Sequence, residues 1–206
     1  RPVKLQPDRV HTPLVLRRGV LPRAAAALNA EQHVILIGPP GTGKTTLSED
    51  LARHAHDLNH NRGHMLVTAT ADWTTFDTIG GYMPGPRERL VFRPGLFLES
   101  IAAQKWLILD EINRADIDKA FGELFTVLSG QAVTLPYKVG DRPVRILPPG
   151  HPTSGDTFDY PIHPSWRIIG TMNVYDKASL FAMSYAFMRR FAFVDVAVPG
   201  AEPFRR

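Results

Sequence analysis

Short apolar runs alternate with amphipathic stretches along most of this 206-residue chain. The apolar runs are rich in β-branched residues and predict five buried strands, at 33–37, 65–70, 106–109, 166–172 and 191–198. Apolar residues three to four positions apart predict helices at 46–55, 95–104 and 117–128. Pro22 near a first turn, followed by four alanines, predicts a helix at 20–29, and 178–187 is also expected to be helical. Strands that alternate with helices in this way predict an α/β fold, with a parallel sheet and helices on both faces.

Glycine and proline residues mark the connections between these elements. Three segments are expected to be largely irregular: 1–19, 71–94 and 148–164. Two hairpins are expected, a small arm at 87–92 and a pairing of 132–135 with 144–147 that turns at Gly140 and Asp141.

The first apolar run leads into Gly38-Pro-Pro-Gly-Thr-Gly-Lys-Thr45, which fits the pattern G-x-x-x-x-G-K-[ST] of a phosphate-binding loop. Its glycines let backbone N–H groups face anionic oxygens, and the N-terminus of the following helix adds a partial positive charge. Lys44 is expected to reach the β- and γ-phosphates, and the Thr45 hydroxyl is expected to hold Mg²⁺. The predicted nucleotide-binding residues are Gly38, Pro39, Pro40, Gly41, Thr42, Gly43, Lys44, Thr45 and Thr46.

Two carboxylates follow the run at 106–109, at a strand end where open α/β sheets bind their ligands. Asp110 is expected to hold Mg²⁺ through a water molecule, and Glu111 to polarise the attacking water. Asn173 follows the run at 166–172, where its amide can hydrogen-bond the γ-phosphate or that water. The alternatives are structural, namely two solvated acids at a strand end and a polar residue in a turn.

Three arginines in the second half of the chain are further candidates for a catalytic role. Arg189 and Arg190 precede the last apolar run, and an arginine can stabilise the charge that develops in phosphoryl transfer, within one subunit or across to a neighbour. The alternative is a basic helix end, which the helix dipole favours. Arg114 can serve a neighbour's site or pair with local acids such as Asp116, and the sequence leaves that choice open.

Composition excludes some classes of protein. The chain has no cysteine, so it has neither disulfides nor thiolate metal sites, which suits a cytoplasmic protein. No apolar run reaches the length of about 18 residues that a membrane span needs. The net charge of +4 is weak support for a nucleic-acid partner, because the basic residues form no dense stripe. His56 and His60 are spaced to hold a metal, but no nearby acid completes a catalytic set, so a polar helix end is favoured.

Together these motifs resemble an AAA+ ATPase. Residues 38–45 resemble Walker A, 107–111 resemble Walker B, Asn173 resembles sensor 1, and Arg189 and Arg190 resemble the arginine-finger region. The segment Asp110-Glu-Ile-Asn-Arg-Ala115, with 170–173 and 188–191, is similar to the dynein-related branch that includes the MoxR and McrB proteins.

The resemblance implies a three-layer core with strands in the order 5-1-4-3-2 and small β-hairpin insertions, assembled as a ring, with a hexamer favoured. The nucleotide would lie between subunits, and the neighbour would supply the finger arginine. Residues 10–21 are a candidate pocket for the base. Tyr82 and Met83 are candidates for contacts in the central pore, with packing against the hairpin arm as the alternative.

The resemblance also implies domain boundaries and cofactors. We expect an irregular lead-in at 1–19, the AAA+ core at 20–198 and the start of a linker to a missing helical lid at 199–206, in a chain that is part of a longer polypeptide. ATP and Mg²⁺ are the implied cofactors. Residues 173–176 differ from the motif of the GTP-using McrB proteins, which favours ATP over GTP.

The predicted function is Mg²⁺-dependent ATP hydrolysis by a ring-forming remodelling or translocating motor. Its protein substrate or effector is not readable from the residues, nucleic acid stays open as a partner, and no membrane is expected. The alternative is a nucleotide-gated scaffold of low turnover, possibly GTP-using, that recruits a nuclease or another effector. A small-molecule kinase is disfavoured by Asn173 and the paired arginines.

Overall fold

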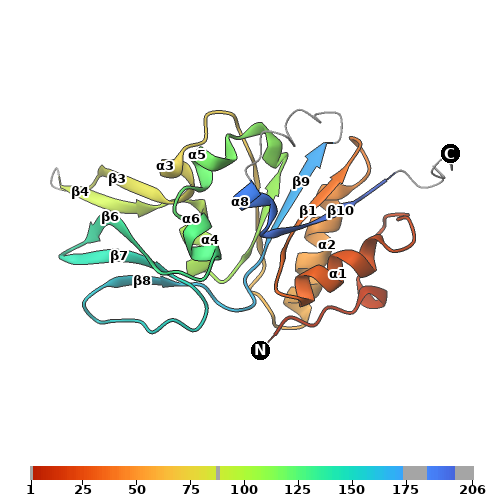
Figure 1. Cartoon of the computed structure of the whole chain (residues 1–206), viewed down its shortest axis with the longest axis horizontal. Helices are drawn as coiled ribbons and strands as arrows, with labels where there is room; N and C mark the ends of the chain where they lie inside the picture. The colour runs from red at the N-terminus through yellow and green to blue at the C-terminus, as the bar shows by residue number, and fades with distance from the viewer. Residues whose placement is uncertain (1, 87–88, 174–184, 198–206) are drawn as a thin grey trace.

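The computed structural model describes residues 2–86, 89–173 and 185–197. Its centre is a five-stranded parallel sheet in the order β10-β1-β9-β5-β2 (Figure 1). The strands are β1 (His33–Gly38), β2 (His64–Thr68), β5 (Trp106–Asp110), β9 (Ile168–Asn173) and β10 (Phe191–Asp195). This confirms the α/β fold class and the predicted strand order, because these are the five strands expected from the apolar runs.

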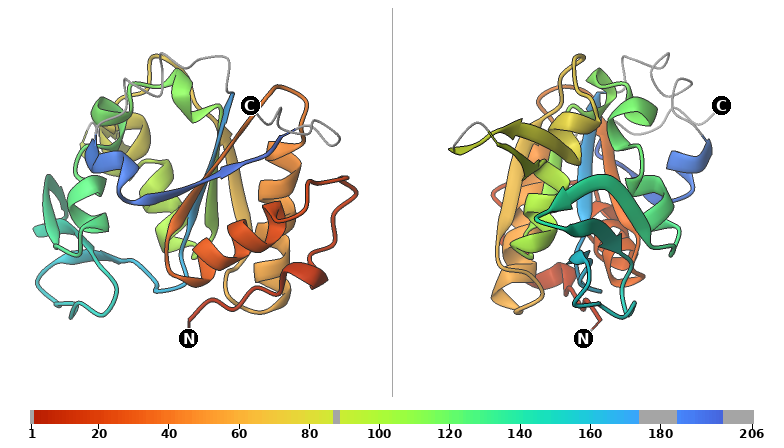
Figure 2. Two further views of the ribbon diagram at one scale, coloured as in Figure 1. Left: turned by 45° about the vertical axis from the view of Figure 1, so that its right-hand side comes forward. Right: turned by 90° about the vertical axis from the view of Figure 1, so that its left-hand side faces the viewer.

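Alternate side chains of the strands pack on opposite faces of the sheet, as the period of two in a strand requires. Val34 and Leu36 belong to one core and Ile35 to the other. The first face is covered by α1 (Val20–Asn29) and α2 (Lys44–Asp57). The second is covered by α4 (Leu96–Ala102), α5 (Ile117–Phe121), α6 (Leu124–Leu128) and α8 (Tyr185–Met188). The result is the expected three-layer arrangement (Figure 2).

The amphipathic stretch at 117–128 forms two short helices, which corrects the prediction of one. Gly122 separates α5 from α6 with φ 43° and ψ −120°. A Cβ at this position would lie 2.7 Å from Cγ2 of Thr75, the first residue of α3 (Thr75–Thr78). The close approach of Thr75 therefore favours glycine where the helix is interrupted. The helical spacing of apolar residues continues across the break, so the sequence pattern does not reveal it.

Two hairpins lie next to each other at the end of the molecule away from α1 (Figures 1 and 2). β3 (Gly80–Pro84) pairs with β4 (Leu90–Pro94), and β6 (Val133–Val139) pairs with β7 (Arg142–Leu147), both antiparallel. The ring of Tyr137 joins them, stacked on Phe92 at 5.1 Å and edge-on to Tyr82 at 5.4 Å. The hydroxyl of Tyr82 also accepts a hydrogen bond from the N–H of Lys138 (2.8 Å), so Tyr82 packs on the second hairpin.

The predicted turn at Gly140 and Asp141 is confirmed, since it connects β6 to β7. Two strands were not predicted, β3 and β8 (Phe158–Pro161), and both lie in segments expected to be irregular. β3 begins with two glycines, which are depleted in strands. β8 is only four residues long and is held beside β7 by a bidentate pair, in which Arg145 donates two bonds of 2.9 Å to Asp159.

The N-terminal segment is irregular apart from a 3-10 turn, η1 (Pro7–Arg9), yet it packs on the domain. Val3 and Leu5 are buried, and Leu5 exchanges two backbone hydrogen bonds with the side chain of Asn29 (2.6 and 3.0 Å). Most of the helix predicted at 178–187, and the linker predicted at 199–206, lie outside the described residues. Among the residues that are described, no helix is both long and apolar enough to cross a membrane.

Candidate active site

A cavity of about 330 Å³ opens where β1, β5 and β9 end at the carboxyl edge of the sheet. It brings together most of the residues predicted for nucleotide, metal and water, and its lining consists of Pro40, Gly41, Gly43, Lys44, Thr45, Thr46, Asp110, Glu111, Thr171 and Asn173. Of the predicted nucleotide-binding residues, Gly38, Pro39 and Thr42 do not line it. They shape the loop instead: the hydroxyl of Thr42 donates to the carbonyl of Pro39 (3.0 Å).

The phosphate-binding loop needs glycine at Gly43 for two reasons. Its φ is +80°, in the left-handed region that favours glycine. A Cβ there would also lie 2.6 Å from Cδ2 of Leu14. The N-terminal segment therefore lies against the loop just before α2 begins, within the range 10–21 predicted for a base pocket.

Lys44, the first residue of α2, is 7% exposed and points back along the loop. Its Nζ donates to the carbonyl oxygens of Gly38 (2.9 Å) and Pro39 (2.7 Å). Burial lowers the pKa of Lys44, while the negative charges of Asp110 and Glu111 act in the opposite direction. Phosphate oxygens are stronger acceptors than neutral carbonyls, so the ammonium group is suited to an anionic ligand.

Asp110 connects the loop to the centre of the sheet. Its Oδ1 accepts hydrogen bonds from the hydroxyls of Thr45 and Thr171, each at 2.6 Å. Hydroxyl and carboxylate oxygens are the hard ligands that Mg²⁺ prefers, and Mg²⁺ usually takes one or two such ligands together with substrate phosphates and water. The donor set of Thr45 and Asp110 therefore fits Mg²⁺ that arrives with a nucleotide.

Glu111 is held beside the cavity by two side chains. Its backbone has φ 52°, which is uncommon for a residue with a side chain. Its Oε2 pairs with Nη1 of Arg114 at 2.9 Å, and its Oε1 lies 3.5 Å from Nδ2 of Asn173. Arg114 thus pairs with a local acid, but this acid is Glu111, whereas Asp116 caps α5 by accepting from the N–H of Lys119 (3.2 Å).

Thr171 is the residue of this cavity that the sequence analysis missed. It sits inside an apolar run, so it reads as part of a buried strand. A signal was present, because Thr171 and Asn173 are two apart and must share one face of the strand.

Arg189 and Arg190 lie elsewhere, around a separate cavity of about 390 Å³ that Leu128 and Ser129 also line. The guanidinium of Arg190 donates to Oγ of Ser129 and lies 5.8 Å from the ring centroid of Phe125. Neither arginine lines the cavity at the phosphate-binding loop. Of the predicted catalytic residues, the structure therefore brings Glu111 and Asn173 together and leaves the two arginines apart.

The histidines near the end of α2 have separate neighbours. His60 lies beyond the helix and accepts a hydrogen bond from the N–H of Lys4 (3.2 Å), and His64 lies 3.6 Å from Glu49. Within the described ranges no group of three or more His, Cys, Asp or Glu side chains is arranged to hold a metal.

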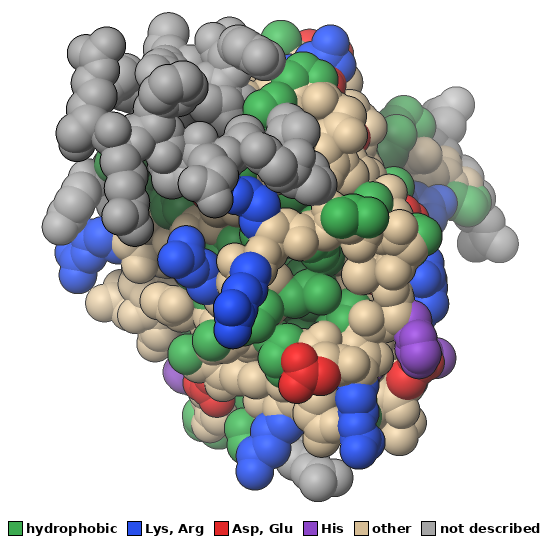
Figure 3. Space-filling view, turned by 90° about the vertical axis from the view of Figure 1, so that its right-hand side faces the viewer, with side chains coloured by type: hydrophobic (Ala, Val, Ile, Leu, Met, Phe, Trp, Pro, Cys, Tyr) green, Lys and Arg blue, Asp and Glu red, His purple; other side chains and the backbone are tan. Residues whose placement is uncertain are grey.

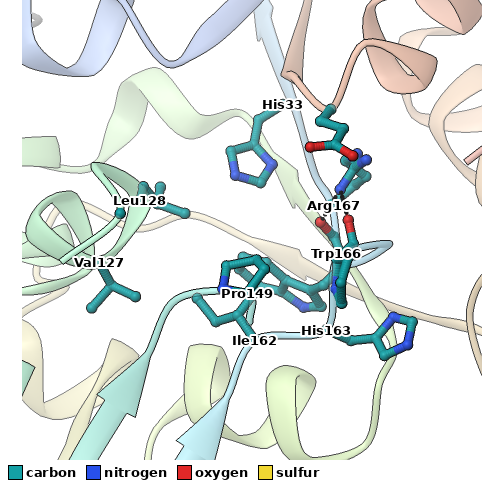
Figure 4. A pocket seen from close by; sticks show the side chains of 11 residues that line it. His33, Val127, Leu128, Pro149, Ile162, His163, Trp166 and Arg167 are labelled. Atoms are coloured by element: carbon teal, nitrogen blue, oxygen red, sulfur yellow. Dashed lines mark hydrogen bonds between the residues drawn. The ribbon is translucent and has the colours of Figure 1, made fainter. Parts of the chain in front are cut away.

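A smaller cavity, of about 150 Å³, lies at the opposite end of β1 and β9 (Figure 4). Val127 and Leu128 of α6 line one side, and Trp166 and Arg167 line the other. The polar groups here bond mainly to the backbone. Arg167 donates to three carbonyl oxygens, those of Leu28 (3.2 Å), Pro164 (2.7 Å) and Trp166 (2.8 Å).

His33 at this end accepts a hydrogen bond at Nδ1 from the N–H of Ile168 (3.0 Å). Burial, with a smaller contribution from the positive charge of Arg167, lowers the pKa of His33 to about 3. Burial also lowers the pKa of Arg167 to about 10, which leaves it charged at neutral pH. The imidazole is therefore neutral, and both side chains serve to join strands and loops.

Comparison with known proteins agrees with this geometry. A family model described as "AAA domain (dynein-related subfamily)" matches residues 33–191, from the start of β1 to the start of β10. Midasin from Dictyostelium discoideum is 28% identical over 189 residues, which cover 88% of this chain and only 3% of that protein. The matched range contains every element around the cavity, and this chain belongs to the dynein-related subfamily of AAA domains, a family of nucleotide hydrolases.

Proposed function

We propose that this chain binds ATP with Mg²⁺ and hydrolyses it as the motor module of a ring-shaped assembly. The observation that carries the proposal is the convergence of Lys44, Asp110 and Glu111 on one cavity from segments far apart in the chain. The hydrogen bond of 2.6 Å between Thr45 and Asp110 holds the phosphate-binding loop against the end of β5.

Each residue has a role that its position supports. The loop N–H groups and Lys44 bind the phosphates, since they present positive charge at the start of α2. Thr45 and Asp110 hold Mg²⁺, and the bound ion would neutralise charge on the phosphates during transfer.

Glu111 takes a proton from the attacking water, and Asn173 orients that water. Glu111 pairs with Arg114 at 2.9 Å, and catalytic contacts often tighten only when substrate binds. Because Arg114 holds the carboxylate at one oxygen and Asn173 lies near the other, Glu111 stays at the rim of the cavity.

The test is to measure ATP binding and hydrolysis by the full-length protein and by Glu111→Gln. Hydrolysis should fall about 10²- to 10⁴-fold, the usual contribution of general acid–base catalysis, while ATP affinity changes little. Glu99→Gln, at an exposed position of α4, is the matched control and should keep the parent rate. An unchanged rate in Glu111→Gln would refute the water-activating role, and binding without turnover in the parent protein would favour the scaffold alternative.

The separate location of Arg189 and Arg190 supports a site completed by a neighbouring subunit. Their cavity shares no lining residue with the cavity at the phosphate-binding loop. Mixing Lys44→Ala subunits with subunits that carry Arg189→Ala and Arg190→Ala should restore part of the hydrolysis, because some interfaces then combine an intact loop with intact arginines. Mixing Lys44→Ala with Glu111→Gln should not. Absence of recovery in assembled mixtures would rule out action across the interface.

We propose ATP as the nucleotide, with its base against the N-terminal segment near Leu14, which lies on the loop at Gly43. Competition between ATP and GTP for the full-length protein tests this choice. The absence of cysteine agrees with the cytoplasm as its location.

We propose a protein rather than a nucleic acid as the remodelled substrate. Nucleic-acid binding calls for a dense basic surface. On the face seen in Figure 3, Lys and Arg side chains are separated by hydrophobic and uncharged ones, despite the net charge of +4. Retention of the assembly on DNA at low salt, with affinity falling steeply as salt rises, would contradict this part of the proposal.

A further inference from the structure

One buried hydroxyl contacts both acids of the site. Thr171 lies on β9, which is paired with β1 on one side and β5 on the other, and it is 2% exposed. Its Oγ1 donates to Oδ1 of Asp110 at 2.6 Å and accepts from the N–H of Glu111 at 3.0 Å. A hydroxyl has one hydrogen to donate, so its donor and one of its acceptor positions are both used within the site.

This hydroxyl stands where the pairing of two strands ends. The register of β5 with β9 stops at Leu109 opposite Gly170, whereas β9 remains paired with β1 as far as Asn173. Beyond that point the N–H of Glu111 bonds to the side chain of Thr171 instead of a backbone carbonyl.

The backbone turns at the same place. Glu111 has the left-handed φ of 52°, a conformation that persists for such residues only when the surroundings hold it. The hydrogen bond from its N–H to Thr171 supplies part of that support, and the bond from the N–H of Arg114 to its carbonyl (2.9 Å) supplies more. The turn takes Glu111 out of the sheet and to the rim of the cavity.

We propose that Thr171 is a positioning residue that sets the metal-holding acid and the water-activating acid relative to each other. This inference rests on the proposed function, since it concerns the same site. Without its hydroxyl, Asp110 loses one of two donors on Oδ1, and the N–H of Glu111 loses its acceptor. Both acids keep their chemistry but lose their fixed geometry.

A purely structural role makes the opposite prediction for the same two substitutions. Thr171→Val keeps the shape of the side chain and removes the hydroxyl, whereas Thr171→Ser keeps the hydroxyl and leaves a gap the size of a methyl group. If Thr171 only fills the core, Val is tolerated and Ser is harmful. If it positions the acids, Ser is tolerated and Val is harmful.

The experiment compares both variants with the parent in the full-length protein. For Thr171→Val we expect kcat to fall, and the Mg²⁺ concentration that half-saturates nucleotide binding to rise, each by about 10-fold, from lost hydrogen bonds to charged or backbone groups. ATP affinity measured without Mg²⁺ should change less than about threefold, because Lys44 and the loop are untouched. Thr171→Ser should restore both values to near those of the parent.

A readout independent of activity is the exchange of the Glu111 amide hydrogen with solvent in nucleotide-free protein. It should speed up in Thr171→Val and stay slow in Thr171→Ser. Thr78→Val is the matched control, because Thr78 is also buried and its hydroxyl bonds to backbone carbonyls of Thr74 (3.2 Å) and Ala120 away from the site. This control should lower stability and leave the Mg²⁺ dependence unchanged.

The outcomes separate the two levels of the proposal. A parent protein that neither binds Mg²⁺–ATP nor hydrolyses it refutes the proposed function. A parent that does both, with Thr171→Val equal to it or with Thr171→Ser as impaired as Thr171→Val, overturns the role of Thr171 and leaves the proposed function standing.

Discussion

The two ends of the central sheet use polar side chains in opposite ways. At the carboxyl end, Thr45, Asp110 and Thr171 bond to one another around a cavity of about 330 Å³. At the amino end, His33 and Arg167 bond to backbone groups beside a cavity of about 150 Å³. The carboxyl end places its polar side chains around one open cavity. At the amino end, the polar side chains connect α1, β9 and the loop before β9.

This difference indicates how one fold separates chemistry from stability. Side chains that bond to each other can exchange partners for a ligand without exposing the backbone. Side chains that satisfy buried carbonyls cannot leave without leaving those carbonyls unpaired, which costs about 1–3 kcal/mol for each group. Substitutions at the carboxyl end should therefore change binding and catalysis, and substitutions at the amino end should change the free energy of unfolding.

The largest effect is expected from Lys44→Ala at the carboxyl end. Loss of the ammonium should weaken nucleotide binding about 100-fold or more, because hydrogen bonds between charged groups are the strong ones. The free energy of unfolding without nucleotide should fall by only about 1 kcal/mol, because Lys44 lines the open cavity and water can take the place of its ammonium on the carbonyls of Gly38 and Pro39. Calorimetric titration and urea unfolding measure the two quantities, with Lys119→Ala at an exposed position as the control.

Arg167→Leu should do the reverse at the amino end. It removes the donor of three backbone carbonyls, two of them in buried bonds, and should lower the free energy of unfolding by about 3 kcal/mol. Nucleotide affinity of the folded protein should stay within about threefold of the parent value. The free energy of unfolding of Arg167→Lys should lie between those of the parent and of Arg167→Leu, because lysine keeps the charge but lacks the planar guanidinium. A loss of nucleotide affinity as large as the loss of stability would show that the two ends of the sheet are coupled. It would contradict the assignment of binding to one end and stability to the other.

The pH dependence of stability should also come from the amino end. The pKa of His33 is about 3 in the folded protein and about 6.5 when unfolded, so the unfolded chain binds more protons between these values. The stabilisation is therefore complete above pH 6.5 and is lost as the pH falls towards 3, with about 2 kcal/mol lost at pH 5.

Urea unfolding between pH 7 and pH 5 measures the effect, and the difference between the parent and His33→Gln isolates it from other titrating groups. Glutamine keeps a hydrogen-bond acceptor for the N–H of Ile168 but does not titrate. An equally steep loss of stability in both proteins would show that other titrating groups cause the pH dependence.

The smallest effect is expected from Arg114→Ala, which should change the free energy of unfolding by less than about 1 kcal/mol, because its pair with Glu111 is exposed to solvent. Arg53→Ala offers a matched contrast, since Arg53 pairs at 2.7 Å, also three positions away in sequence, with an aspartate, Asp50, that is only 3% exposed. It should cost more, because a buried carboxylate is left without its cation. Equal losses of stability in the two variants would show that burial of the carboxylate does not determine the strength of the pair.

Patterns local in sequence predicted much of the fold. The apolar runs predicted the five parallel strands and, with the family resemblance, their order, and the helix expected at 20–29 is α1. The loop motif and the acids after β5 predicted residues that do share a cavity, although their chemical roles stay predictions.

Features that depend on distant contacts were not predicted. The break at Gly122 lies where Thr75 approaches the backbone closely, and β8 is held by the pair of Arg145 with Asp159. Thr171 was hidden because a threonine in an apolar strand is ordinary until its hydroxyl is seen between two carboxyl-bearing residues. The spacing from Asn173 places Thr171 on the face of the site, but the residues to which it bonds lie about 60 positions earlier in the chain, where a local pattern does not reach.

The break at Gly122 also determines how the two cavities on either side of it lie relative to each other. The segment from Glu111 to Ser129 begins at the subunit's own cavity and ends at the serine that holds Arg190. Each residue in a helix advances the chain by 1.5 Å and about 100°, so merging α5 and α6 would shift and rotate Ser129 relative to Glu111. Gly122 thus fixes the distance and the rotation between the cavity at the phosphate-binding loop and the serine that contacts Arg190.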